Sequence, residues 1–128
     1  MSPSQPPETW QPETGGDRFT VTHDPGAGEC VLRLRGELDH DTAPALRAEL
    51  RRCEGAGSTR VLVDCSSLGF CDSTGLSVLL DARARANVRG AAIVLVGLAP
   101  VVARIFEITG ADSLFPRYRT VAQARAAG

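Results

Sequence analysis

The sequence predicts an α/β domain in which a mixed β-sheet of four to five strands packs with about four α-helices. Short apolar runs alternate with longer segments whose apolar residues recur at helical spacing. Two early runs, residues 18–23 and 30–35, flank a Gly-rich turn and predict an antiparallel hairpin. A predicted helix separates 30–35 from the run at 59–64, which predicts a parallel pair. The two kinds of pairing together make the predicted sheet mixed.

The composition narrows the classes of function. The chain has 128 residues, 43% of them hydrophobic, and a net charge of −1, which suits one globular domain and offers no basic surface for nucleic acid. All 14 basic residues are Arg, so mechanisms that need a Schiff-base or P-loop lysine are excluded. The sequence shows no signal peptide and no apolar run near membrane-spanning length. We therefore expect a cytoplasmic protein without membrane association.

The cysteines and histidines form no recognisable metal motif. No two cysteines make a C-x-x-C pair, and His23 and His40 are far apart in the sequence, which argues against a zinc site. We expect all the cysteines to be reduced thiols, mostly buried as small apolar residues. They are Cys30, Cys53, Cys65 and Cys71.

The first 16 residues differ in composition from the rest. They hold four of the eight prolines and little apolar material, which predicts a disordered arm over residues 1–16. Trp10 stands alone in this arm, as an incidental residue or a docking anchor. The folded domain is predicted to span residues 17–127.

A helix is predicted over residues 43–53. Its apolar residues follow one stripe, and its Arg and Glu residues mark the opposite face. Asp41 or Thr42 is the expected N-cap, Pro44 suits the first turn, and the Gly-rich stretch at 55–57 ends the helix.

The stretch 61–80 contains the predicted functional segment. The strand at 59–64 leads into a polar loop, and a helix is predicted to start at about Ser73 and to run to about Asn87. Strand, loop and helix in this order is how α/β folds present functional groups. The next run, 91–96, is apolar throughout, which predicts a central strand buried on both faces.

Two further helices and an edge strand complete the domain. One helix is predicted to begin near Pro100 and to close at Thr109–Gly110. A short strand follows at 114–118, where a proline argues for an edge position. Thr120 is the expected N-cap of a last, Ala-rich helix, with Gln123 at the capping-box position.

Ser73 admits three hypotheses on the residues alone. It is an N-cap worth about 1 kcal/mol, with Asp72 and Thr74 as competitors. It is a nucleophile, although no G-x-S-x-G elbow surrounds it and only His40 offers a base. Or it is a phosphorylation site, because a helix N-terminus tolerates the added charge of about −1.5 to −2. Spacing favours the N-cap and leaves the phosphorylation site open.

Three segments together resemble the anti-sigma factor antagonists of bacteria, the single-domain STAS proteins. The segment 68–76, LGFCDSTGL, resembles their phosphorylation loop, and 36–43, GELDHDTA, resembles the loop before their first helix. The segment 100–106, PVVARIF, matches their late helix. The resemblance covers about residues 17–126, in the family's order and spacing, and implies a STAS-like fold.

The resemblance also implies a phosphorylation-controlled switch that is not an enzyme and has no cofactor of its own. The unmodified protein is expected to bind an anti-sigma factor that is also a serine kinase, and so to free a sigma factor, as in stress responses. The kinase would use its own ATP to phosphorylate Ser73, with Thr74 as the alternative acceptor, and a PP2C-type phosphatase would reset the switch. The protein is expected to be a monomer or a weak dimer. The alternative is a STAS domain that scaffolds a larger signalling complex, or senses a small ligand, without a sigma factor output.

The residues expected to contact the kinase lie in the two loops that resemble the family. The acidic ones suit a basic surface on the partner, with Asp39 and Asp72 as the strongest candidates; the competing interpretation is that they only cap helices and face solvent. Cys71 stands where relatives have a larger apolar residue. It is interpreted either as a small buried side chain or as a redox-sensitive thiol. The full predicted contact set is Glu37, Asp39, Asp41, Asp72, Thr74 and Gly75.

Overall fold

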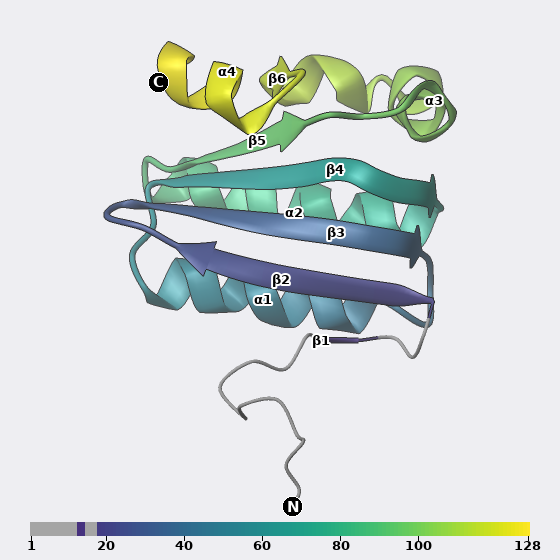
Figure 1. Ribbon diagram of the computed structural model, residues 1–128, viewed down its shortest axis with the longest axis horizontal. Helices are drawn as coiled ribbons and strands as arrows, with labels where there is room; N and C mark the ends of the chain where they lie inside the picture. Colours follow the sequence, from purple (N-terminus) through teal and green to yellow (C-terminus); the bar gives the residue numbers. More distant parts are fainter. Residues whose placement is uncertain (1–12, 15–17) are drawn as a thin grey trace, which may run out of the picture.

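The computed structural model describes residues 13–14 and 18–128, and within them it forms one mixed sheet packed with helices (Figure 1). The strands pair in the order of the chain. They are β1 (Glu13–Thr14), β2 (Phe19–Pro25), β3 (Glu29–Leu38), β4 (Arg60–Cys71), β5 (Ala92–Val96) and β6 (Arg117–Tyr118). The first three pair antiparallel and β3 to β6 pair parallel, which confirms the predicted mixed sheet. The predicted disordered arm, residues 1–16 with Trp10, lies outside the described residues apart from β1, a short strand that the sequence did not predict.

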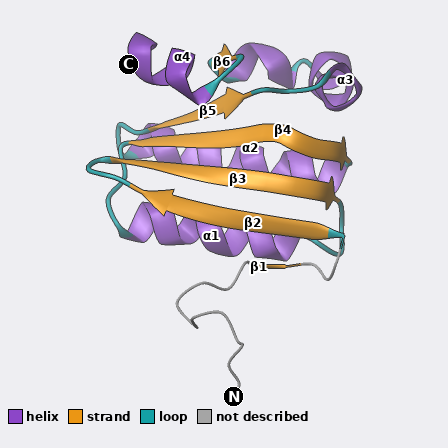
Figure 2. Ribbon diagram, viewed as in Figure 1, coloured by secondary structure: helices purple, strands orange, loops and turns teal. Residues whose placement is uncertain are grey.

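The helices follow the predicted positions closely. Figure 2 shows α1 and α2 side by side behind the long strands. The described part of the chain contains α1 (Ala43–Gly55), α2 (Ser73–Val88), α3 (Pro100–Thr109), the 3₁₀ helix η1 (Ala111–Leu114) and α4 (Val121–Ala127). Thr120 caps α4 as predicted, since its hydroxyl accepts a hydrogen bond from the Gln123 N–H at 3.0 Å.

The main core lies on the face of the sheet that α1, α2 and α3 cover. Side chains that this core buries completely include Leu32, Val63 and Leu95. A smaller cluster lies on the opposite face and contains Val31, Leu62, Val94 and Ala124 of α4. The central strands are therefore buried on both faces at these positions, as predicted for residues 91–96.

Strand β4 is longer than the predicted strand at 59–64. It continues through the expected loop to Cys71, and β3 likewise continues to Leu38. Two register shifts against β3 place the inward side chains of β4 at Cys65, Leu68 and Cys71. This spacing of three hides the two-residue period of a strand, which is why the sequence predicted a loop here.

One of these register shifts depends on Gly36. Its φ angle is +100°, and a Cβ atom at this position would collide with the backbone carbonyl of Arg18. The neighbouring Glu37 N–H donates a hydrogen bond to that same carbonyl at 2.8 Å. The glycine thus brings the end of β3 against the start of β2.

The prediction of four reduced cysteines is wrong for two of them. Cys30 on β3 and Cys53 on α1 form a disulfide, with Cα atoms 6.6 Å apart. Because α1 runs back along the sheet, its last turn packs on the start of β3 (Figure 1). The two cysteines are 23 residues apart in the sequence, so their spacing does not indicate this contact. Cys65 and Cys71 are free and buried.

No helix in residues 13–14 and 18–128 combines the length and the apolar character needed to cross a bilayer.

Candidate functional site

The two predicted loops meet at the carboxyl ends of β3 and β4. Leu38 pairs with Cys71 in the parallel register, and the Asp72 N–H donates to the Leu38 carbonyl at 3.0 Å. The loop that follows Leu38 and the start of α2 are therefore neighbours at one edge of the sheet. The structure thus brings together the acidic loop and the Ser73 loop, which lie more than 30 residues apart in the sequence.

Asp72, rather than Ser73, caps α2. The Asp72 backbone is extended, and its Oδ1 accepts hydrogen bonds from the Thr74 N–H at 2.9 Å and the Gly75 N–H at 3.0 Å. Ser73 is the first helical residue and is exposed. The N-cap hypothesis for Ser73 is wrong, because the longer carboxylate side chain before it already satisfies these N–H groups.

The Ser73 hydroxyl is available for chemistry. Within the described chain it makes no hydrogen bond, either to a histidine or to a carboxylate. Nothing among these residues activates it as a nucleophile in the way that a hydrolytic triad requires. The hydroxyl can instead be reached by a group on another molecule.

Gly75 sets how closely α2 approaches β3. The residue is buried, and a Cβ atom there would lie 2.6 Å from Leu38 Cγ and 3.1 Å from Cys71 Sγ. Only a residue without a side chain allows this contact. Gly75 therefore has a packing role within the domain, while its predicted role as a partner contact, like that of the half-buried Thr74, stays a prediction.

Thr42 organises the acidic loop in a way the sequence did not predict. It stands at the N-cap position of α1, but its hydroxyl makes no capping hydrogen bond. Instead it accepts from the Asp39 N–H and donates to the Glu37 carbonyl, both at 2.8 Å. Asp39 Oδ1 in turn accepts from the Asp41 N–H at 3.0 Å. Thr42 is therefore the N-cap residue of α1, one of the two predicted, but its hydroxyl folds the loop instead of capping the helix N–H groups.

Arg18 lies among the three carboxylates of this loop and was missed from the sequence. Its guanidinium is 2.6 Å from Asp39 Oδ2, 3.0 Å from Glu37 Oε1 and 3.6 Å from Asp41 Oδ2. The hydrogen bond from Arg18 lowers the pKa of Asp39 to about 2, with backbone N–H groups contributing, and the carboxylates raise the pKa of Arg18. The predicted antiparallel hairpin could have revealed this contact, because it places Phe19 opposite Gly36 and hence Arg18 beside Glu37.

Exposure separates the acidic candidates. Asp41 and Glu37 have side chains 78% and 54% exposed, whereas Asp39 is 19% exposed. Asp39 therefore mainly contacts Arg18 and the loop backbone, and Glu37 and Asp41 are the carboxylates more accessible to a partner. Three carboxylates against one guanidinium still leave the loop negative.

Two apolar residues complete the description of the site. Phe70, which pairs with Glu37 in the register, is 47% exposed and offers a contact that the sequence analysis did not single out. Burial, and secondarily the nearby Asp72, raises the pKa of the Cys71 thiol to about 12. Cys71 is thus a protonated thiol near neutral pH, which favours the small buried residue over the redox-sensitive one.

The chain is similar in sequence to several known proteins. Residues 22–116 match the family model described as "Mlab, STAS domain". The anti-sigma F factor antagonist of Paenibacillus polymyxa is 30% identical over 97 residues, which cover 71% of this chain and 79% of the relative. The anti-sigma-B factor antagonist of Staphylococcus epidermidis is 30% identical over 95 residues, which cover 74% and 85%.

Solved structures show the same fold. An anti-sigma factor antagonist from Mycobacterium paratuberculosis has a TM-score of 0.79 at 28% identity, covering 88% of this chain and 95% of that chain. The anti-sigma factor antagonist SpoIIAA in its unphosphorylated form has a TM-score of 0.72 at 24% identity, covering 81% and 91%. The chain therefore belongs to the STAS-domain family of anti-sigma factor antagonists.

Proposed function

We propose that this chain is a cytoplasmic, phosphorylation-controlled antagonist of an anti-sigma factor. In its unmodified form it binds an anti-sigma factor that is also a serine kinase, and a sigma factor is released. The kinase transfers the γ-phosphoryl group of its own ATP to Ser73, and the modified antagonist dissociates. A PP2C-type phosphatase then restores the hydroxyl. In this scheme the chain itself carries out no catalysis and needs no cofactor.

The observation that carries the proposal is the position of Ser73. It is an exposed hydroxyl in the first turn of a 16-residue helix, and Asp72 already provides the cap. Phosphorylation therefore removes no hydrogen bond from the fold. The helix N-terminus favours added negative charge by about 0.3–1 kcal/mol, which offsets part of the repulsion from the Asp72 carboxylate. We expect the modified domain to stay folded.

Phosphorylation is expected to weaken binding of the partner rather than to destabilise the domain. A phosphoryl group adds about −1.5 to −2 charges at neutral pH, next to a loop whose three carboxylates outnumber the one arginine that contacts them, Arg18. A partner shaped to hold the neutral hydroxyl then meets extra bulk and like charge, and such juxtaposition costs several kcal/mol at an interface. Exposed Phe70, Glu37 and Asp41 are the side chains best placed to meet a mixed apolar and basic surface.

The relatives support the same scheme. The similar proteins are named antagonists of anti-sigma F and anti-sigma-B factors, so an anti-sigma factor is the expected partner. SpoIIAA, which shares the fold, is known in unphosphorylated and phosphorylated forms. A fold that exists in both forms suits a switch that acts by dissociation.

Mapping the phosphorylated residue tests the proposal. The chain is incubated with its anti-sigma factor kinase and ATP, and the product is located by peptide mass spectrometry. We expect a single phosphoryl group on Ser73, none on Ser73→Ala, and normal modification of the matched variant Thr74→Val. Modification at Thr74 alone contradicts the assignment. Recovery of partners that include no ATP-dependent kinase would favour the alternative, a STAS scaffold or small-ligand sensor.

A further inference from the structure

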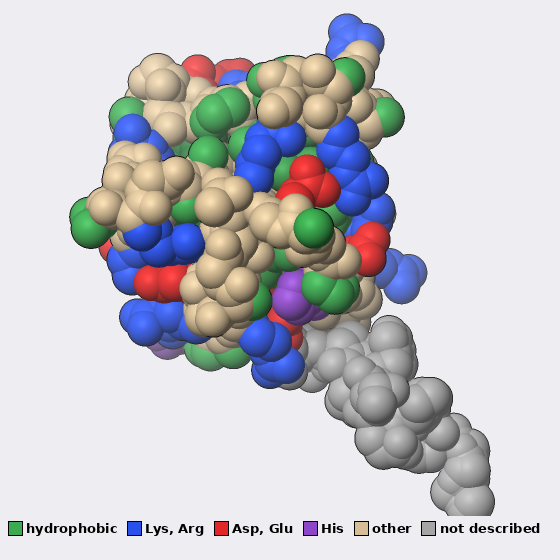
Figure 3. Space-filling view, turned by 90° about the vertical axis from the view of Figure 1, so that its left-hand side faces the viewer, with side chains coloured by type: hydrophobic (Ala, Val, Ile, Leu, Met, Phe, Trp, Pro, Cys, Tyr) green, Lys and Arg blue, Asp and Glu red, His purple; other side chains and the backbone are tan. Residues whose placement is uncertain are grey.

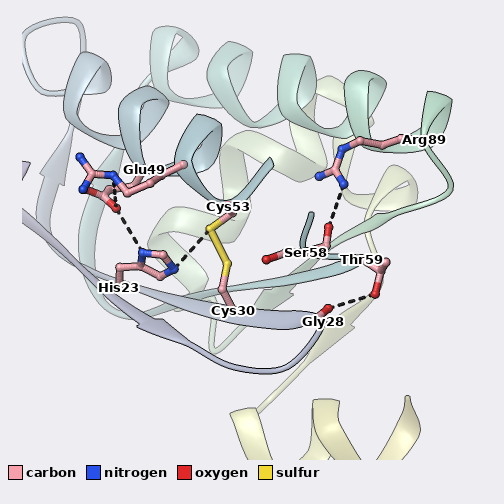
Figure 4. The surroundings of a disulfide bond; sticks show 9 residues. His23, Gly28, Cys30, Glu49, Cys53, Ser58, Thr59 and Arg89 are labelled. Carbon is pink, nitrogen blue, oxygen red and sulfur yellow. Dashed lines mark hydrogen bonds and ion pairs between the residues drawn. A yellow bond between two sulfur atoms is a disulfide. The ribbon is translucent and has the colours of Figure 1, made fainter. Parts of the chain in front are cut away.

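A second group of reactive side chains lies at the end of the sheet opposite Ser73. His23 on β2 and Cys30 and Cys53 come together there, with their ligand atoms all within 4.8 Å of one another. Figure 4 shows His23 between the disulfide and Glu49, with both contacts drawn. The Nε2 atom of His23 lies 3.8 Å from Cys53 Sγ, and its Nδ1 atom lies 3.6 Å from Glu49 Oε1.

The cluster follows from strand and helix periodicity. Phe19, Val21 and His23 alternate onto the inward face of β2. Cys30 lies on the same face of β3, two residues from Leu32, the partner of His23. Glu49 and Cys53 are four residues apart, on the face of α1 that meets these strands.

We propose that His23, Cys30 and Cys53, with both cysteines reduced, form a binding site for a thiophilic divalent cation, in the first place Zn²⁺. The disulfide is the oxidised, cation-free form of the same site. Two thiolates and one imidazole are ligands that Zn²⁺ prefers, and three protein ligands leave a fourth position for water or another exchangeable group.

The backbone geometry suits both forms. Zn–S bonds of about 2.3 Å and a Zn–N bond of about 2.0 Å in a tetrahedral site put two thiolates about 3.8 Å apart and a thiolate and an imidazole nitrogen about 3.6 Å apart. The second distance is close to the present separation of His23 Nε2 and Cys53 Sγ, 3.8 Å. The Cα atoms of Cys30 and Cys53 are 6.6 Å apart, near the upper end of what a disulfide spans. Rotation about the Cα–Cβ bonds therefore separates the two sulfurs without moving β3 or α1.

Glu49 orients the imidazole of His23. Its side chain is buried, and Oε1 makes no hydrogen bond among the described residues but lies within ion-pair distance of His23 Nδ1, at 3.6 Å, and of Arg52 Nε, at 3.8 Å. A carboxylate facing Nδ1 favours the tautomer with the proton on Nδ1, which leaves the Nε2 lone pair toward the cysteines. A cation on Nε2 makes the Nδ1–H a stronger donor, so the contact between His23 Nδ1 and Glu49 Oε1 strengthens.

The site is accessible from solvent, and its disulfide and cation-bound forms can interconvert. The His23 side chain is 21% exposed, and the surface at this end of the molecule mixes Arg and acidic side chains with scattered apolar ones (Figure 3). A dithiol reduces the disulfide with two electrons and two protons and becomes a disulfide itself; a phosphine supplies two electrons and becomes the phosphine oxide, with the oxygen and both protons taken from water. Either reaction gives two thiols, and binding of Zn²⁺ then releases both protons. The reducing cytoplasm that this requires rests on the location proposed above.

The experiment uses Co²⁺ and Zn²⁺ on the full chain, reduced with a phosphine and freed of reductant under argon. We expect a single Co²⁺ per chain with a thiolate-to-cobalt charge-transfer band, displaced by Zn²⁺, and no band in the oxidised protein. Cys53→Ala and His23→Ala should lose or strongly weaken the band, whereas the matched controls Cys71→Ala and His40→Ala keep it. Circular dichroism checks that each variant is folded.

Glu49 acts as a positioning residue and has its own readout. Glu49→Gln should bind Co²⁺ about 10- to 100-fold more weakly with the same charge-transfer band, because the ligands remain. The proposal is overturned if reduced wild type shows no band, or if folded His23→Ala and Cys53→Ala bind as the wild type does. No partner protein enters this experiment, so its failure is distinct from a failure of the phosphorylation switch.

Discussion

Replacing Gly75 with alanine tests how the site is assembled. The new Cβ atom would lie 2.6 Å from Leu38 Cγ and 2.8 Å from Leu38 Cδ2, well inside the usual 3.5–4.0 Å of carbon contacts. Leu38 is fully buried and cannot turn away, so α2 or β3 must shift. Helix propensity gains about 1 kcal/mol from the substitution, whereas overpacking a core costs about 1–3 kcal/mol. We expect a net loss of up to about 2 kcal/mol in the free energy of unfolding.

Urea unfolding of the oxidised protein measures this loss. With a slope of about 2 kcal/mol per molar urea for a domain of this size, the midpoint should fall by up to about 1 M. The matched control is Gly55→Ala at the end of α1, where a Cβ meets nothing within 4 Å; that variant should be at least as stable as the wild type. If Gly75→Ala gains stability as Gly55→Ala does, the close approach of α2 to Leu38 is refuted.

Three further perturbations follow from contacts at the two ends of the sheet. Asp72→Ala should lower the free energy of unfolding by about 1 kcal/mol through loss of the α2 cap, and Asp72→Ser should restore most of it; equal stability of all three proteins in urea would contradict the capping role. Arg18 lowers the pKa of Asp39 from 3.8 to about 2. The difference in the free energy of unfolding between wild type and Asp39→Asn should therefore be fully present above pH 3.8 and should disappear as the pH falls toward 2. Urea unfolding at each pH measures this difference, and a difference that stays constant across the acidic range would argue against the Arg18 contact. Reducing the Cys30–Cys53 disulfide in the presence of a chelator should lower the free energy of unfolding by about 3 kcal/mol, from the loop closed by its 23-residue separation, whereas an unchanged urea midpoint would show that no disulfide had been present.

The fold was predictable wherever residue periodicity matched regular structure. The predicted helix at 43–53 corresponds to α1, and the apolar run at 91–96 corresponds to β5, since one shows a clear stripe and the other is buried on both faces. The extension of β4 was not predictable in the same way. Its register shifts space the inward residues by three, and such a spacing resembles neither a strand nor a regular loop.

The site was predictable in its location but not in its detail. The predicted helix start at about Ser73 is correct, although β4 takes the place of the expected loop before it. Which of the adjacent polar residues caps the helix depends on side-chain geometry that spacing does not resolve, and Asp72 takes that role. Arg18 was missed because its contacts come from cross-strand pairing, a relation between residues that are distant in the sequence.

The cysteine prediction failed for a similar reason. Motif spacing looks for ligands close together in the chain, whereas Cys30 and Cys53 meet through the packing of α1 on β3. Alternation along β2 also places His23 on the inward face, so the three-residue cluster was implicit in the predicted hairpin and helix. Combining the inward positions of neighbouring elements would have found it.

The central claim is that phosphorylation of Ser73 controls binding to the anti-sigma factor. The most direct measurement is the affinity of the anti-sigma factor, held with ADP so that it cannot phosphorylate its ligand, for unmodified and stoichiometrically Ser73-phosphorylated protein, each verified as folded by circular dichroism. We predict that phosphorylation weakens binding at least about 100-fold, the equivalent of about 2.7 kcal/mol, while Ser73→Ala binds as the unmodified protein does. Equal affinities of the folded unmodified and phosphorylated forms would contradict the account.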